Sequence, residues 1–332
     1  MTNDNAPILT VILVNYNGWP DITRLLGTLL NEPAFRSGRL AVVVVDNASE
    51  GPIPEQLLSP PPGGLRLLLR PDNGGFAVGV NAGWRLAQSP WLLVLNPDVE
   101  VEVGWIDQVI ERVEQLDRLP SGPPGIVGFG LRNPDGTPQG SVGVFPSLFR
   151  TIREQFIPRS RRKYQADWRI RPGPVDWVTG ACMLVNSRMI AELGGMDEDF
   201  FLYYEEVAFS RRAQDLLWRV EYDPSLSLIH RHPLQNRRLS SRMRVITRHS
   251  KLLYFRKHLP AWQFRALCWI VSAEALVKGL GARILGREPD RQAWKTIGKV
   301  ARTMRAGVDV KGAEVRKLAE VGSGEWAAGS GQ

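Results

Sequence analysis

The sequence predicts an α/β fold with a mostly parallel central sheet, and three observations carry this prediction. Short apolar runs alternate with segments of helical apolar spacing through the first half of the chain. Within each run almost every residue is apolar, which is typical of strands buried on both faces. Polar turns rich in Asn, Asp and Gly follow the runs directly. Such alternation is typical of a parallel sheet with helices on both faces.

The elements of the first half are expected in the following order. The strands are Ile8–Val14, Leu40–Val45, Leu65–Leu69, Trp91–Leu95 and Ile126–Phe129, and the helices are Pro20–Leu30, Phe76–Ala87 and Val103–Leu116. Because crossovers between parallel strands are right-handed, the carboxyl ends of the strands are expected along one edge. Open α/β sheets bind their ligands at that edge.

The second half is less regular. Residues 131–175 are rich in Pro, Gly and Arg and predict a loop-dominated segment with a short hairpin. A strand is expected at Trp177–Val185, a helix from Glu205 to Leu217, and short strands at Arg219–Tyr222 and Leu226–Ile229.

Composition sets broad limits on the protein. The 332 residues are 43% apolar and 23% charged, which is ordinary for a globular protein. Cys182 and Cys268 lie in apolar surroundings and predict buried thiols in a reducing compartment. Met1 to Pro7 is polar, and no run of 18 residues is free of charge. We therefore expect a cytoplasmic protein without a signal peptide or an ordinary transmembrane helix.

Four polar turns follow the expected strands and predict a nucleotide pocket. They are Asn15-Tyr16-Asn17, Asp46-Asn47-Ala48-Ser49, Asp72-Asn73-Gly74-Gly75 and Asn96-Pro97-Asp98. One such turn means little, but four at the same edge indicate a common binding crevice. The glycine fingerprints of dinucleotide-binding and P-loop proteins are absent from the sequence, which disfavours both classes.

Asp98 is the most informative single residue. It follows the buried run Trp91–Leu95, and a carboxylate at a strand end can hold a divalent cation against a diphosphate, since such cations prefer oxygen ligands. Asp is also common in ordinary turns after strands, so this residue alone does not separate the two interpretations.

Several motifs, in this order, resemble the family 2 glycosyltransferases of the GT-A fold, and most closely their bacterial rhamnosyltransferase-like branch. They are Val14-Asn15-Tyr16-Asn17, Val44-Val45-Asp46-Asn47-Ala48-Ser49, Asn73-Gly74-Gly75-Phe76-Ala77 with Asn81-Ala82-Gly83, Leu95-Asn96-Pro97-Asp98, Thr179-Gly180-Ala181-Cys182-Met183-Leu184, Gly194-Gly195-Met196-Asp197-Glu198-Asp199-Phe200-Phe201 and Tyr203-Tyr204-Glu205-Glu206-Val207. The resemblance covers about residues 8–235.

The resemblance implies transfer of a sugar from a nucleotide-diphosphate donor to an acceptor hydroxyl, with inversion. Asp46 would hold the base or ribose, and Asn73 with its glycines would shape a loop near the donor. Asp98 and His230 would bind a divalent cation, Mg or Mn. The other expected donor-binding residues are Asn15, Asn17, Asn81 and Asn96, the last standing in place of the first acid of an Asp-x-Asp motif.

The general base is expected in the aromatic-acid motif, because a sugar hydroxyl is a poor nucleophile and must lose its proton as it attacks. The family pattern Glu-Asp-Val-Asp reads Glu205-Glu206-Val207-Ala208 here. Glu206 stands at the position of the base with a side chain one methylene longer, and Ala208 lacks an acid. Glu205 is the alternative base, or an acid that only stabilises a helix start.

The last third of the chain is basic. Nine Lys or Arg and no Asp or Glu lie between Arg231 and His258, and the Trp-bearing amphipathic stretch Ala261–Leu285 follows. This pattern predicts either peripheral contact with an anionic membrane or a helical region packed on the core. No nucleic-acid-binding motif accompanies it. The expected division is a GT-A catalytic domain over 1–235, a basic helical region over 236–320 and a disordered tail over 321–332.

The sequence thus predicts a metal-dependent inverting glycosyltransferase of cell-surface polysaccharide synthesis. By resemblance its donor is dTDP-rhamnose, and its acceptor a saccharide or a lipid-linked saccharide at the inner face of the plasma membrane. Two alternatives remain at this point. One is a nucleotidyltransferase, and the other a non-catalytic nucleotide-sugar-binding protein, which the Glu206 and Ala208 departures allow.

Overall fold

The computed structural model describes residues 6–60, 64–154, 171–232 and 239–320. Its strands are β1 (Leu9–Asn15), β2 (Leu40–Asp46), β3 (Gly64–Leu69), β4 (Trp91–Leu95), β5 (Val99–Glu100), β6 (Ile126–Arg132), β7 (Pro138–Gln139), β8 (Val142–Gly143), β9 (Gly173–Pro174), β10 (Trp177–Val178), β11 (Cys182–Asn186) and β12 (Val220–His230). Its helices are α1 (Trp19–Leu29), α2 (Pro33–Arg36), α3 (Glu55–Leu58), α4 (Phe76–Leu86), α5 (Trp105–Asp117), α6 (Leu148–Arg153), α7 (Ser187–Leu193), α8 (Glu205–Asp215), α9 (Ser241–His258), α10 (Ala261–Ile284), α11 (Glu288–Arg305) and α12 (Gly312–Glu320).

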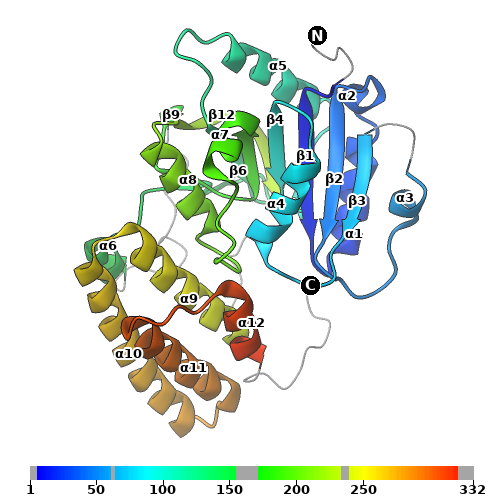
Figure 1. Ribbon diagram of the computed structural model, residues 1–332. Helices are drawn as coiled ribbons and strands as arrows, with labels where there is room; N and C mark the ends of the chain where they lie inside the picture. The colour runs from blue at the N-terminus through cyan, green and yellow to red at the C-terminus, as the bar shows by residue number, and fades with distance from the viewer. Residues whose placement is uncertain (1–5, 61–63, 155–170, 233–238, 321–332) are drawn as a thin grey trace.

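The main sheet has the strand order β3-β2-β1-β4-β11-β6-β12-β5 (Figure 1). The first four of these strands are parallel, with Asn15 opposite Asp46 at the ends of β1 and β2. β11 runs antiparallel between β4 and β6, whereas β12 is parallel to β6. The expected mostly parallel sheet is therefore confirmed, and the four polar turns follow neighbouring strands.

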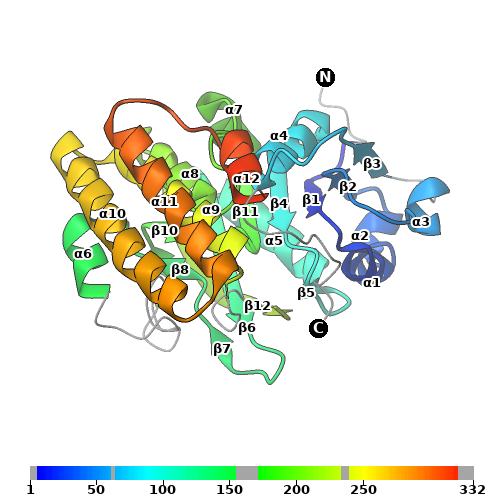
Figure 2. The ribbon, with the colours of Figure 1, turned by 90° about the horizontal axis from the view of Figure 1, so that it is seen from below.

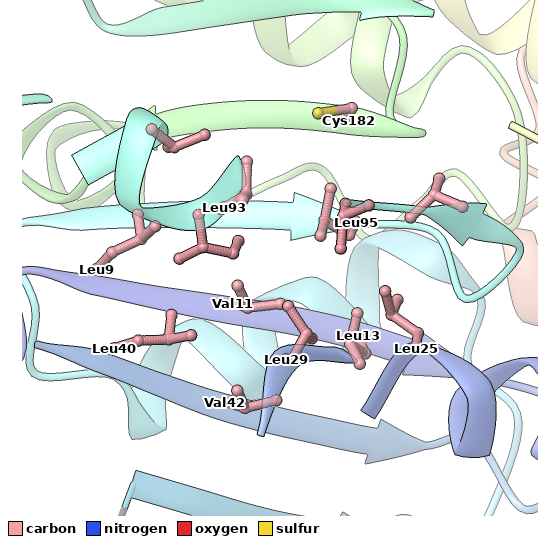
Figure 3. Packing of buried hydrophobic residues seen from close by; sticks show 14 of the residues in the cluster. Leu9, Val11, Leu13, Leu25, Leu29, Leu40, Val42, Leu93, Leu95 and Cys182 are labelled. Atoms are coloured by element: carbon pink, nitrogen blue, oxygen red, sulfur yellow. The ribbon is translucent and has the colours of Figure 1, made fainter. Parts of the chain in front are cut away.

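Each face of the sheet is covered by helices, as the sequence pattern predicts. On β1, Leu9, Val11 and Leu13 pack on the side of α1 and α5, and Figure 3 shows them beside Leu93 and Leu95 of β4. The alternate residues Ile12 and Val14 pack against α4 on the opposite side. Burial of each such side chain contributes about 1.5–3 kcal/mol, so both faces of the sheet contribute to the stability of the domain.

One expected strand is divided in two in the structure. The run Trp177–Val185, expected as one strand, forms β10 and β11, which are separated by Thr179-Gly180-Ala181. β10 pairs with β8 in a small second sheet that packs on β6. The close approach needs Gly128, because a Cβ there would lie 2.6 Å from Val178 Cγ1. This packing, which is not encoded locally, divides the run.

The expected strands Arg219–Tyr222 and Leu226–Ile229 are one strand, β12. Its register against β6 shifts between Asp223 and Ser227. Pro224 lies in this interval and has no N–H to donate, so the ladder is interrupted there and resumes beyond it. The continuation carries the chain to His230 at the end of β12.

Helices α9 to α12 form a layer beside the main sheet (Figures 1 and 2). Their apolar faces surround Phe200 and Phe201, the aromatic residues that precede α8. Gly312, at the start of α12, lies so close to this segment that a Cβ would be 2.6 Å from Phe201 N. The helical layer therefore supports the loop that leads to Glu205 and Glu206.

Most cations of the basic block that lie in the described residues are paired within the fold. Acids from other elements pair with most of its cations: Arg231 with Glu100, Arg242 with Glu320, Arg244 with Asp290, Arg248 with Glu274, Arg256 with Asp309, and Lys257 with both Asp197 and Asp199. The acids that pair with these cations lie outside the stretch from Arg231 to His258, in parts of the chain that the fold brings next to it.

Two expectations concern segments that the structure does not describe. The division between residues 235 and 236 lies within 233–238, and the expected disordered tail is 321–332, so both remain predictions. In the described part of the chain, none of the helices has the length and apolar character needed to cross a membrane.

Candidate active site

A cavity of about 1850 Å³ opens at the carboxyl ends of the parallel strands. Most of the expected site residues line it: Asn15, Asn17, Asn73, Asn96, Asp98, Glu205, Glu206 and His230. Pockets for one small ligand usually enclose about 300–1,000 Å³. This cavity is large enough for a nucleotide sugar and a second substrate together.

Asp46 lies behind the cavity wall and does not line it. Its carboxylate is buried and accepts hydrogen bonds from Asn15 Nδ2 at 2.8 Å and from the Ser49 backbone N–H at 2.9 Å. Ser49 Oγ in turn accepts a bond from the backbone N–H of Asn17 at 2.7 Å. Asp46 therefore holds together the two turns, at the ends of β1 and β2, that form this wall.

The loop before α4 is fixed by contacts from both sides. Asn73 Oδ1 accepts a hydrogen bond from Gly75 N, and Asn47 Nδ2 donates to Gly75 O, each at 3.0 Å. Gly75 has φ +99°, and a Cβ there would lie 2.2 Å from the carbonyl oxygen of Phe201. That oxygen accepts a bond from Phe76 N at 3.0 Å. Only glycine permits this contact between the expected donor loop and the segment that leads to Glu205 and Glu206.

Asn81 is the other expected donor-binding residue that the structure does not bring to the cavity. It is buried in α4, where its amide donates to Met196 O and to Glu198 Oε1 and accepts from Met196 N. These bonds fix residues 196–198 against α4. The direct donor-binding role expected for Asn81 has no support in this geometry.

Asp98 and His230 meet because β5 pairs with the end of β12, with Val99 opposite His230. Asp98 Oδ1 lies 3.3 Å from His230 Nε2, and the other ring nitrogen, Nδ1, lies 2.9 Å from Gln139 Nε2. Burial acts to raise the pKa of Asp98, but the hydrogen bond from His230 and the charges of His230 and His232 outweigh it and lower that pKa. Asp98 is therefore ionised at neutral pH.

The donor set at this pair fits a divalent cation. A carboxylate oxygen and an imidazole nitrogen suit Mn²⁺, and Mg²⁺ is commonly held by one or two carboxylates together with substrate phosphates. Within the described residues, no cluster of three or more His, Cys, Asp or Glu side chains surrounds a cation position. Among the described residues that line the cavity, Arg242 is the only Lys or Arg.

Glu205 and Glu206 open helix α8 and are both buried in the wall of the cavity. The two preceding residues, Tyr203 and Tyr204, have positive φ angles of 69° and 71°, which non-glycine residues rarely adopt. Such strain persists only where the surrounding structure imposes it. Here the Tyr204 ring packs 5.8 Å from that of Tyr254, and Ser250 Oγ donates to Leu202 O at 2.8 Å.

Glu206 and Ala208 of α8 lie in different surroundings. A Cβ on Gly180 would lie 3.9 Å from Glu206 Cβ, so Glu206 adjoins the turn between β10 and β11. The amino end of a helix stabilises a carboxylate, which applies to both acids. Ala208, where the family pattern has an acid, is fully buried among the apolar residues that surround Phe200. A carboxylate at that position would have to be buried in an apolar core at a large cost.

The family is decided by comparison with known proteins. Residues 10–194 match the model of glycosyl transferase family 2, which is more than half of the chain. The chain belongs to glycosyl transferase family 2. It is therefore a glycosyltransferase, and the nucleotidyltransferase alternative is not supported.

Two relatives span most of the transferase. The N-acetylglucosaminyl-diphospho-decaprenol L-rhamnosyltransferase of Mycobacterium tuberculosis is 29% identical over 245 residues, which are 67% of this chain and 76% of the relative. The low-salt glycan biosynthesis hexosyltransferase Agl10 of Haloferax volcanii is 25% identical over 286 residues, covering 82% of this chain and 84% of the relative.

Solved structures show the same GT-A-like fold. The mannosyltransferase PcManGT of Pyrobaculum calidifontis, in complex with GDP-Man and Mn²⁺, matches with a TM-score of 0.51 at 17% identity, over 96% of this chain and 87% of that one. GalNAc-T7 with UDP, GalNAc and Mn²⁺ matches with a TM-score of 0.52 at 16% identity, over 76% and 48%. At 17% and 16% identity, the similarity to these two structures shows the fold alone.

The structure of the transferase adds residues that sequence reasoning missed. Gln139, His232 and Arg242 line the cavity, together with Tyr16 of the expected turn Asn15-Tyr16-Asn17. His232 could have been suggested by its spacing of two from His230, because alternate residues of an extended segment share a side. Gln139 and Arg242 lie in segments without a recognisable pattern. Burial raises the pKa of Tyr16, although Arg316 and Arg242 oppose that rise.

Proposed function

We propose that this protein is an inverting, divalent-cation-dependent rhamnosyltransferase. It would transfer rhamnose from dTDP-rhamnose to a lipid-linked saccharide in cell-surface polysaccharide synthesis. The observation that carries the proposal is one cavity that joins the Asp98–His230 pair to Glu205 and Glu206. The sugar and the acceptor are suggested by the mycobacterial relative.

The acids supply the proton transfer in the proposed reaction. An acceptor hydroxyl attacks the anomeric carbon of the donor sugar from the face opposite the diphosphate. The new C–O bond forms as the bond to the diphosphate oxygen breaks, and that oxygen keeps the electron pair. The Glu206 carboxylate takes the hydroxyl proton, with an expected gain of about 10²- to 10⁴-fold in rate.

Asp98 and His230 are the residues proposed to hold Mn²⁺ or Mg²⁺. Such a cation, when bound, offsets the charge that develops on the leaving diphosphate. Arg242, whose guanidinium is held 2.9 Å from Glu320 on the wall of the cavity, is proposed to donate hydrogen bonds to the diphosphate in addition. The turns that Asp46 and Asn73 stabilise are proposed to orient the nucleoside.

The proposed acceptor is anchored in a membrane, so the protein would work at the inner face of the plasma membrane as a peripheral protein. The size of the cavity supports this choice of substrates, because it accommodates a nucleotide sugar with the saccharide end of an acceptor. The lipid part of the acceptor would remain outside.

Transfer by the purified full chain tests the proposal. The protein is incubated with Mn²⁺ and a short-chain prenyl-diphosphate N-acetylglucosamine as the acceptor. Each reaction contains one donor, which is dTDP-rhamnose, UDP-N-acetylglucosamine or GDP-mannose. With dTDP-rhamnose we expect the mass of the acceptor to increase by one rhamnose residue. The NMR coupling at the anomeric carbon of the product should report inversion, and EDTA should abolish product formation. The Glu206→Gln variant serves as the background.

Other outcomes of this assay would change the conclusion. Transfer from another donor alone would correct the sugar and keep the enzyme class. An absence of transfer and of donor hydrolysis, together with metal-dependent nucleotide binding, would favour the non-catalytic nucleotide-sugar-binding alternative.

A further inference from the structure

Helix α10 is apolar on two opposite faces. Its inner face, which includes Phe264, Leu267 and Val271, packs against α9 and α11 in the core of the helical layer. Its outer face carries large apolar side chains that are each more than half exposed: Trp262, Trp269, Leu276, Leu280 and Ile284. At about 100° per residue, these five lie within an arc of about 80°. We call this set the α10 stripe.

The stripe is long, and a neighbouring helix also carries exposed apolar side chains. From Trp262 to Ile284 it extends over about 33 Å, at about 1.5 Å per residue. Helix α6 lies beside α10 in both views of the ribbon, and Leu148 N donates to Gln263 Oε1 at 3.1 Å (Figures 1 and 2). Two residues of α6, Phe149 and Ile152, are also exposed. An exposed apolar surface as long as the stripe marks an interaction site.

The charges beside the stripe are positive. Arg265, Arg283 and Arg287 are exposed, and none forms an ion pair among the residues that the structure describes. The guanidinium of Arg305 lies 3.7 Å from the ring centroid of Trp269 and adds a cation to the stripe itself. Glu274, the acid of α10, is bridged by Arg248 and Lys278. The stripe is therefore an apolar surface with cationic flanks.

We infer that the α10 stripe is a docking surface for an anionic lipid bilayer, in which the helix lies parallel to the membrane plane. Apolar side chains with Trp enter the interface of a bilayer while flanking Arg residues attract anionic headgroups. A second copy of the chain fits less well, because two stripes in contact would bring these arginines toward one another. The inference concerns where the protein is held and does not depend on which sugar it transfers.

Co-sedimentation of the full chain with vesicles tests the inference. We expect binding to phosphatidylcholine vesicles that contain phosphatidylglycerol, weak binding to pure phosphatidylcholine, and a decrease as salt rises. Trp269→Glu combined with Leu280→Glu should lower the fraction bound at least about 10-fold. Arg265→Gln combined with Arg283→Gln should weaken binding to the anionic vesicles alone.

A matched double variant controls for the added negative charge. Leu58→Glu with Val103→Glu replaces two exposed apolar side chains on α3 and before α5, away from α10, and should bind as the parent does. Thermal unfolding of each variant reports whether it is folded. Donor hydrolysis without vesicles should be equal in the parent and the stripe variant, which separates docking from chemistry.

Three results would overturn the inference. One is a parent protein that does not bind anionic vesicles at low salt. Another is equal loss of binding in the stripe variant and in its control. The third is a parent that is dimeric by light scattering, does not bind vesicles and becomes monomeric in the stripe variant, which would identify the stripe as a contact between copies.

Discussion

Asp98 Oδ1 lies 3.3 Å from His230 Nε2 at the wall of the cavity, although the two residues are far apart in the sequence. The pairing of the two-residue strand β5 with the end of β12 brings them together. Their contact also depends on Gln139, whose amide lies against the second ring nitrogen of His230.

Replacement of Asp98 by Asn should weaken Mn²⁺ binding in the presence of a nucleoside diphosphate by at least about 10-fold, because an amide lacks the charge that a divalent cation prefers. Isothermal titration calorimetry measures the affinity. The control is Glu111→Gln, which removes the charge of an exposed acid on α5 and should leave the Mn²⁺ affinity unchanged. Equal affinities of the parent and Asp98→Asn would remove Asp98 from the metal site.

Gln139→Leu should weaken Mn²⁺ binding about 10- to 100-fold, the usual effect of losing a partner that orients a ligating His. Gln139 Oε1 is buried and has no hydrogen-bond partner among the described residues. If the amide turns over, this oxygen can accept a hydrogen bond from the Nδ1–H of His230, which keeps the proton on Nδ1 and leaves the lone pair of Nε2 available for a cation. Gln139→Glu keeps an oxygen and should retain the affinity, as should Gln108→Leu, which replaces an exposed residue of α5. A Leu variant that binds like the parent would contradict this role.

Glu206→Gln should lower turnover about 100-fold or more with little change in donor binding, because the substitution keeps the size and removes the proton acceptor. Glu205→Gln should have a milder effect. Glu206→Asp restores the residue of the family pattern and should keep measurable activity. Initial rates and calorimetric donor affinity separate these effects. Full activity of Glu206→Gln would transfer the role of base to Glu205 or another acid.

Gly75→Ala should destabilise the protein by about 3 kcal/mol, because its Cβ would lie 2.2 Å from the Phe201 carbonyl oxygen in addition to the cost of a positive φ. Gly122→Ala isolates the second effect, since Gly122 has φ +74° and open space around it. That variant should lose only about 1 kcal/mol. Urea denaturation gives both values. Similar losses of unfolding free energy in the two variants would indicate that the loop before α4 moves away from Phe201 at no energetic cost.

The ion pair between Arg248 and Glu274 should make stability depend on pH. Burial acts to raise the pKa of Glu274, but hydrogen bonds and charges from Arg248 and Lys278 outweigh it and lower that pKa to about 2. An unfolded chain has a value of about 4.3, so the contribution is complete above about pH 5 and is lost as the pH falls toward 2.

Glu274→Gln should therefore lower the free energy of unfolding by about 2 kcal/mol at neutral pH, and the difference from the parent should shrink near pH 3.5. Urea denaturation at the two pH values measures it. The exposed Glu111→Gln variant should show no such trend. A difference that is constant with pH would mean that the pair does not set the pKa of Glu274.

Local patterns are sufficient to predict much of the catalytic fold. The uninterrupted apolar residues of β1, β2 and β4 report burial on both faces, and the polar turns after them report where those strands end. Since parallel strands end at one edge, the sequence alone assigns Asn15, Asn73 and Asp98 to a common crevice.

The sequence by itself determined the class of the sheet, the edge that binds ligands and the acids that open α8. The tertiary structure alone decided that Asp98 meets His230, that Asp46 and Asn81 act behind the cavity wall, and that the cations of α9 are paired while the outer face of α10 is exposed. Spacing along a chain reports the period and burial of one element. Which elements pack together depends on contacts between distant residues, and no local pattern contains them.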